Sequence, residues 1–208
     1  MGFCKKEAAA DMQAPRQVFS LQRAIAICVA ASAFTVSAIA GEAGRFDVAR
    51  WAANLPTRYA VHGVKTEPTY EEALDLRRDG DVFVVVGGAP GWSARSTESV
   101  KVSADGILSR SPCGANEDCR LASPPAGFLA TAALIAAQRR GALASAPSVL
   151  LPFGDRRVVC VDAARLGIER PILDPCFDLR TGAAIAQRHR LSGRFDGPTL
   201  DAASIRFD

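Results

Sequence analysis

The sequence predicts an α+β fold: a single domain over residues 41–208, with a mainly antiparallel sheet and one long apolar helix packed on it. Three observations support this prediction. Short β-rich runs are separated by tight Gly-containing turns, one Ala- and Leu-rich run has helical end signals, and strands do not alternate regularly with helices. Four cysteines in the same range predict that disulfides also hold the domain.

Residues 1–40 have the pattern of a secretory signal peptide. Four Lys and Arg residues precede an uncharged run of 17 residues, Ala24–Ala40. The run ends in small residues, Ala38 and Ala40, at the positions that a signal peptidase reads, so cleavage is predicted after Ala40. The alternative is an uncleaved membrane anchor, for which this run is barely long enough. No membrane span is predicted once the signal is removed.

Composition excludes two classes of protein. Removing the four Lys/Arg and two Asp/Glu of residues 1–40 from the totals of 25 and 22 leaves 21 cations and 20 anions. This balance excludes the strong positive field of a dedicated nucleic-acid binder, so no nucleic-acid partner is predicted. A hydrophobic content of 49% and a charged content of 23% exclude a mainly disordered chain.

The first elements after the leader are a helix and a strand. Apolar residues recur at roughly helical spacing over residues 46–55, and Asp47 supplies a negative charge near the expected N-terminus. Residues 59–65 alternate between apolar and polar side chains, which is typical of a half-buried strand.

Residues 70–80 are compatible with two structures. Their apolar spacing favours a helix that ends at Gly80, and this is the structure we predict. The alternation of Leu74 and Leu76, followed by Asp79-Gly80, indicates a strand and a hairpin turn instead. Residues 82–86 are predicted as a strand because β-branched side chains dominate them.

The middle of the chain predicts a hairpin and then the main helix. Residues 99–103 and 107–108 flank an Asp-Gly turn. Two prolines precede the Ala-, Leu- and Ile-rich run 126–140, which ends in two Arg and a Gly. Pro in the first turn, cations at the C-terminus and Gly just beyond it are all typical of a helix. This run is the predicted long apolar helix.

The remainder of the chain predicts strands. β-branched and aromatic residues are frequent in these segments, and Gly-containing turns separate them. Two hairpins and a closing strand are expected, over residues 149–151 with 157–161, 177–180 with 183–190, and 204–207.

Export would place the cysteines in an oxidising compartment, where an even number favours disulfides. Four cysteines allow three pairings, of which proximity favours Cys113–Cys119 and Cys160–Cys176. The alternative is zinc, but the spacings of five and fifteen intervening residues lack the close Cys-x-x-Cys pairs of structural zinc sites. Neither a metal nor a cofactor is predicted.

The Gly-rich segment 87–95 is the candidate ligand-binding site. Gly87 and Gly88 allow the backbone to approach an anion closely. Trp92 offers a flat ring, and Arg95 can bind a carboxylate or phosphate through two donors. The segment contains neither common nucleotide-binding glycine pattern. The alternative is an irregular loop whose Trp packs back on the core.

An exported serine hydrolase is the alternative function. Residues 91–95 differ from the G-x-S-x-G pattern only at the last position, which makes Ser93 the candidate nucleophile. The sequence has two histidines, His62 and His189. Because His189 lies between two Arg residues that lower its basicity, His62 is the preferred base.

The leading hypothesis is a small non-catalytic protein, periplasmic or secreted, that binds an unknown cell-envelope ligand or protein. The leader, the disulfides and the scarcity of catalytic constellations favour it. A third hypothesis is an accessory subunit that presents an apolar patch or a sheet edge to its partner.

Overall fold

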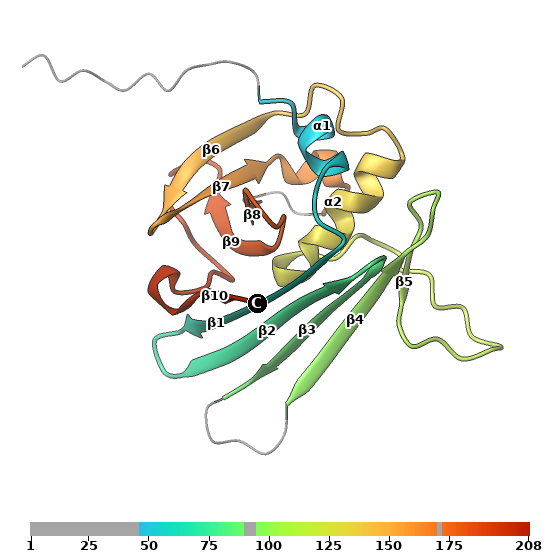
Figure 1. Ribbon diagram of the computed structural model, residues 1–208, viewed down its shortest axis with the longest axis horizontal. Coiled ribbons are helices and arrows are strands. Elements are labelled where there is room, and N and C mark those ends of the chain that lie inside the picture. The colour runs from blue at the N-terminus through green and yellow to red at the C-terminus, as the bar shows by residue number, and fades with distance from the viewer. Residues whose placement is uncertain (1–45, 90–94, 170–171) are drawn as a thin grey trace, which may run out of the picture. The chain divides into compact units, whose positions relative to one another are not determined.

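The computed structural model describes residues 46–89, 95–169 and 172–208, all within the compact unit Glu42–Asp208. The predicted leader and cleavage position therefore lie outside the described residues, as do Trp92 and Ser93. Two antiparallel sheets and short helices make up the described fold (Figure 1). The antiparallel pairing agrees with the predicted sheet, but the strands form two sheets rather than one.

Sheet A has six strands in the order β10-β1-β2-β3-β4-β5. Strands β1 to β4 follow one another along the chain, and β10 adds to the free edge of β1. Alternate residues point to opposite faces, so the buried core residues of each strand lie on the inner face, whereas the outer face mixes polar side chains such as Asp75 with apolar ones such as Val84. The strands are β1 (Arg58–Thr66), β2 (Glu71–Asp79), β3 (Val82–Gly88), β4 (Ser96–Val102), β5 (Leu108–Arg110) and β10 (Arg206–Phe207).

The helix predicted over residues 70–80 is wrong, because β2 occupies this segment. Leu74, Leu76 and Arg78 alternate on the buried side of the strand. The backbone of β2 is paired with β1 on one side and β3 on the other, which a helix could not achieve. Long-range pairing therefore overrides the helical spacing of the apolar residues, as often happens in strands.

Sheet B has four strands in the order β6-β7-β8-β9. On β7, Val158 and Cys160 face one apolar cluster, whereas Val159 and Val161 face another. A sheet that is buried on both faces requires continuous apolar runs instead of alternating apolar and polar residues. This explains why residues 158–161 of β7 are all apolar. The strands are β6 (Ser148–Phe153), β7 (Arg156–Val161), β8 (Leu173–Asp178) and β9 (Ala184–His189).

The predicted long apolar helix is a short one. Helix α2 (Ala130–Arg139) has 10 residues, and a 3-10 turn, η1 (Gly127–Leu129), leads into it. Residues 130–137 are all buried, because α2 lies between sheet B and strands β3 to β5 (Figure 1). The smaller helical elements are α1 (Val48–Ala53), η2 (Ala163–Leu166) and η3 (Ala202–Ser204). None of the helices in the described ranges is long and apolar enough to cross a membrane.

Polar contacts fix α2 between the two sheets. The buried Thr131 hydroxyl donates to the Gly182 carbonyl and accepts from the Ala184 amide, both at 2.9 Å, which ties the start of α2 to β9. At the other end, Arg139 donates to the carbonyls of Val102 (2.9 Å) and Ser103 (2.7 Å). Because these groups are paired, burying them adds no unsatisfied polar atoms.

Both predicted disulfides are present, with the pairing that proximity favours. Cys113–Cys119 closes the loop that follows β5. Cys160–Cys176 joins two residues that are direct partners on β7 and β8, inside the core.

Replacing Cys160 and Cys176 together by Ala should lower the free energy of unfolding by about 3 kcal/mol. A bridge with a sequence separation of 16 removes that much chain entropy from the unfolded state, and the Cys113–Cys119 bridge, with a separation of 6, should remove about 2 kcal/mol. Urea denaturation without reductant measures both losses. An equal or larger loss for the Cys113/Cys119 double variant would contradict this ranking.

The substitution Ala133→Leu should lower the free energy of unfolding by about 1–3 kcal/mol, because Ala133 is fully buried on α2 and leaves no room for three more carbons. Thermal unfolding followed by circular dichroism measures the change. The exposed Ala144→Leu is the matched control, with little expected effect. Equal melting temperatures for both variants would contradict the close packing of α2.

Candidate functional site

A pocket of about 240 Å³ opens on the inner face of sheet A, near the N-terminal end of β4. Strands β1 to β4 contribute one side of it, and η1 with Pro198 contributes the other. Its apolar lining comprises Leu74, Val85, Phe128, Leu129 and Pro198, and its polar lining comprises Lys65, Glu72, Ser96 and Glu98.

Strand register brings these side chains together. Leu74 on β2 is the partner of Gly87 on β3, and Gly87 is in turn the partner of Ser96 on β4. Val85 is paired with Glu98 two residues further along the same strands. Along each strand, these five residues are separated from the buried core residues by an even number of positions. They therefore lie on the same side as the core, the inner face of the sheet.

The charges in the pocket are mainly negative. The Lys65 Nζ lies 2.8 Å from Glu67 Oε1 and 4.0 Å from Glu72 Oε2. The hydrogen bond to Glu67 raises the pKa of Lys65, so the ammonium stays charged and is neutralised by its neighbours. Glu72 and Glu98 then give the pocket an excess of negative charge.

Gly87 is required by the packing of this pocket. A Cβ at Gly87 would lie 2.9 Å from Leu74 Cδ2 and 2.5 Å from Glu72 Oε1. The missing side chain therefore makes room for the Glu72 carboxylate over β3.

The predicted ligand-binding residues do not all lie in one place. Gly87 lines the pocket, but Gly88 has the opposite parity on β3 and is paired with Ala73. Arg95 donates to Asp75 Oδ2 at 3.1 Å, and Asp75 is on the outer face because it alternates with the buried Leu74. Gly87 and Arg95 therefore do not form a single site. Trp92 is outside the described residues, so its role stays a prediction.

His62, the predicted base of the alternative hydrolase, is bound by two carboxylates on the outer face. Its Nδ1 lies 2.6 Å from Asp75 Oδ1, and its Nε2 lies 2.9 Å from Asp208 Oδ2. The hydrogen bond to Asp75, and next that to Asp208, raise the pKa of His62. An imidazole that donates to a carboxylate from each ring nitrogen has no free lone pair to accept a proton. Ser93 lies outside the described residues, so the hydrolase stays a prediction.

His189, the other histidine, lies in β9, where its Nδ1 accepts from the Ser192 amide at 3.2 Å.

A larger depression of about 500 Å³ lies at the opposite end of β1 and β2. Burial raises the pKa of Tyr59 there to about 12, so its phenol stays neutral at physiological pH. Most of the other lining residues are charged, and Arg58 and Asp79 pair with each other in solvent. Without an apolar floor this depression is the weaker candidate.

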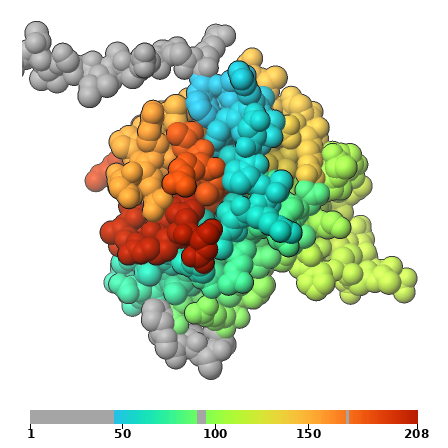
Figure 2. Space-filling view, viewed as in Figure 1, coloured from blue at the N-terminus to red at the C-terminus, as the bar shows by residue number. Residues whose placement is uncertain are grey.

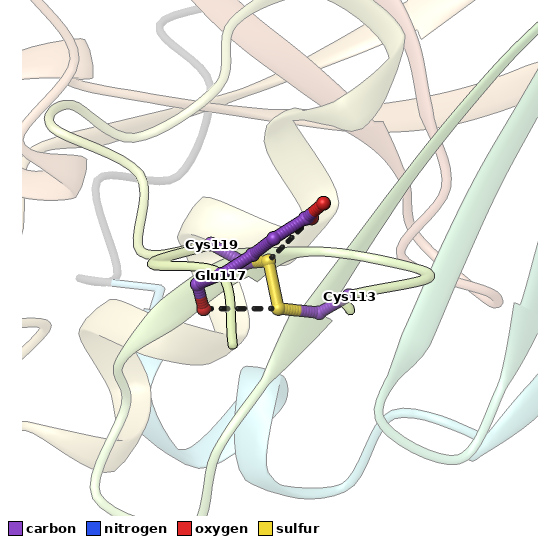
Figure 3. A group of neighbouring side chains, drawn as sticks. All are labelled: Cys113, Glu117 and Cys119. Carbon is purple, nitrogen blue, oxygen red and sulfur yellow. Dashed lines mark hydrogen bonds between the residues drawn. A yellow bond between two sulfur atoms is a disulfide. The ribbon is translucent and has the colours of Figure 1, made fainter. Parts of the chain in front are cut away.

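Cys113, Glu117 and Cys119 form the cluster shown in Figure 3, where the Glu117 side chain lies beside the disulfide. The Glu117 Oε2 is 3.8 Å from the Cys119 sulfur, and the Glu117 carbonyl oxygen is 3.6 Å from the Cys113 sulfur. A metal would need thiolates, and both sulfurs are engaged in the disulfide. In this oxidised state, Glu117 is the only metal ligand that the cluster offers.

No protein-family model matches this sequence. No curated protein and no solved structure matches it either.

Sequence reasoning missed Lys65, Glu72, Ser96 and Glu98. Each lies toward the end of a strand, on the same side of the strand as its buried residues. A polar residue on the buried parity is a signal that could have found them, because such residues mark places where the core gives way to a polar cavity. For Glu72, using that signal requires that β2 first be recognised as a strand.

The substitution Glu117→Gln should speed the reduction of Cys113–Cys119 by a dithiol about 2- to 5-fold. Reduction turns Cys119 into a thiolate, which a carboxylate 3.8 Å away disfavours. Quenched alkylation and mass spectrometry measure the rate. In the control Asp118→Asn, the lost carboxylate bonds the Arg120 amide rather than a sulfur, so no change is expected. A similar acceleration in both variants would contradict this role of Glu117.

Proposed function

We propose that this protein is an exported, non-catalytic binding module that takes a small cell-envelope ligand in the pocket between sheet A and η1. The pocket is the main observation that supports this proposal, because an apolar floor with a few polar groups around it is the usual composition of a ligand site. At about 240 Å³ it is smaller than the cavities that hold drug-sized molecules, so it suits a compact ligand.

The charges of the pocket favour a ligand that carries a cation. Lys65 is already paired with Glu67, whereas Glu72 and Glu98 add negative charge at two places around the floor. An ammonium or guanidinium group attached to a short aliphatic body would place its charge near these carboxylates and its carbons on Leu74 and Val85.

The disulfides support export. Two disulfide bridges in one small domain are typical of an oxidising compartment. Together with the predicted signal peptide over residues 1–40, they favour a periplasmic or secreted protein.

The position of His62 supports binding over catalysis. His62 lies on the outer face of sheet A, whereas the pocket lies on the inner face. The strand layer thus separates the imidazole from any ligand held against Leu74.

The proposal is tested with three probes of one chain length: n-hexylammonium, 1-hexanol and hexanoate. Methyl shifts of Leu74 and Val85 in NMR titrations should respond to n-hexylammonium at the lowest concentration and to hexanoate at the highest. Glu72→Gln and Glu98→Gln should each weaken n-hexylammonium binding about 5-fold, the effect expected of one partly exposed ion pair.

Glu71→Gln is the matched control, because Glu71 neighbours Glu72 on the opposite face of β2 and should have no effect. If none of the probes shifts the Leu74 or Val85 methyls, the pocket does not bind ligands of this kind. If hexanoate binds best, the pocket is a ligand site but its preference for cations is wrong.

A further inference from the structure

His62 joins three segments of the chain on the outer side of sheet A. It belongs to β1, Asp75 belongs to β2, and Asp208 follows β10. Ionised carboxylates only accept hydrogen bonds, so the contacts at 2.6 Å and 2.9 Å require both ring nitrogens to donate. The ring therefore holds both partners only as an imidazolium.

Asp208 belongs to the segment that covers the edge of β1. In this segment the Asp208 amide donates to the Ala60 carbonyl at 3.2 Å, and the Ser204 hydroxyl accepts from the Val64 amide at 2.8 Å. Between these contacts β10 pairs with Val61 and His62. In Figure 2 the C-terminal residues, in red, lie on the surface beside β1. The segment thus satisfies backbone groups that would otherwise leave β1 an open edge.

We propose that His62 is a pH-sensitive latch: as an imidazolium it holds the C-terminal end of the chain over the edge of β1, and its deprotonation releases that end.

The neutral ring keeps one N–H, and the surroundings assign it to Nδ1. Asp75 makes the shorter bond and is 20% exposed, whereas Asp208 is 72% exposed. Arg95, at 3.1 Å, and Arg77, at 3.9 Å, also hold Asp75 in place. The Nε2 lone pair then faces the Asp208 carboxylate, and two acceptors cannot bond each other.

The charged groups around His62 set the direction of the switch. Arg77 and Arg95 contact Asp75 rather than the ring. Arg206 is the register partner of His62, but its guanidinium donates to two backbone carbonyls, those of Ala203 and Ile205. The two carboxylates contact the ring itself, and their hydrogen bonds raise its pKa above the ordinary value. The latch is therefore closed when the pH is below the ordinary pKa of an imidazole. It opens as the pH rises through the raised pKa of His62.

Release is confined to the last few residues. Leu200 and Ile205 are each 1% exposed and anchor the segment in the core. Phe207 lies beyond this anchor, with the Arg156 guanidinium 4.4 Å from its ring centroid. Opening therefore frees the end of β10 without unfolding the domain.

Amide hydrogen exchange by NMR, corrected for intrinsic rates, tests the latch between about pH 5 and about pH 9, a range that brackets an imidazole pKa. The opening constant at the Asp208 amide should rise about 2- to 5-fold as His62 loses its proton, which is the effect of one exposed charged pair. The Leu200 amide, bonded to the Ile185 carbonyl at 2.9 Å, is the internal control and should not change.

Two variants separate the latch from a general effect of pH. Asp208→Asn should lower the pKa of His62, followed by its ring ¹⁵N shifts, and His62→Gln should make the opening constant independent of pH. Asp79→Asn is the control, because the Asp79 side chain is 78% exposed, close to the 72% of Asp208, but pairs with Arg58. Two results would overturn the proposal. One is an opening constant at the Asp208 amide that does not change while His62 titrates, and the other is an unchanged His62 pKa in Asp208→Asn.

Discussion

The fold depends on the burial of α2 between the two sheets. Face-to-face sheets pack about 10 Å apart, and a helix is itself about 10 Å across, so the sheets must separate where a helix lies between them. Strands β1 and β2 pack directly on sheet B around Val61 and Ile185. Strands β3 to β5 pack on α2, and their core residues Phe83, Val100 and Leu108 belong to the apolar cluster that contains this helix. This arrangement divides the core into two apolar clusters and buries the central strands of sheet B on both faces.

The pocket follows from that separation. Turn η1 leads into α2 at the end of sheet A where Lys65 and Ser96 lie, and there η1 and Pro198 cover the inner face only in part, which leaves the pocket. Positions that would otherwise be apolar core can be polar, so Glu72 and Glu98 occur on the buried parity of their strands. A site built in this way is held by backbone pairing on the strand side, which fixes the floor more firmly than a loop could.

The two faces of β2 have different roles. Leu74 contributes to the pocket, whereas the adjacent Asp75 binds His62 and Arg95 on the outer face. Closure of the β1 edge depends on residues more than a hundred positions later, among them Asp208. The edge of sheet A is thus protected by the end of the chain, a common way to prevent unwanted strand pairing.

The sequence by itself determined the antiparallel character and most of the hairpins, and it favoured the disulfide pairing that the structure has, because turn residues, β-branched runs and cysteine proximity act over short separations. Only the tertiary structure decided that residues 71–79 form a strand, since two partner strands outweigh a helical apolar spacing. It also decided that α2 is short and lies between two sheets, and that Gly87 and Arg95 lie apart. Which face a residue occupies, and which residues meet across strands, depends on register, and register is fixed only when distant segments pair.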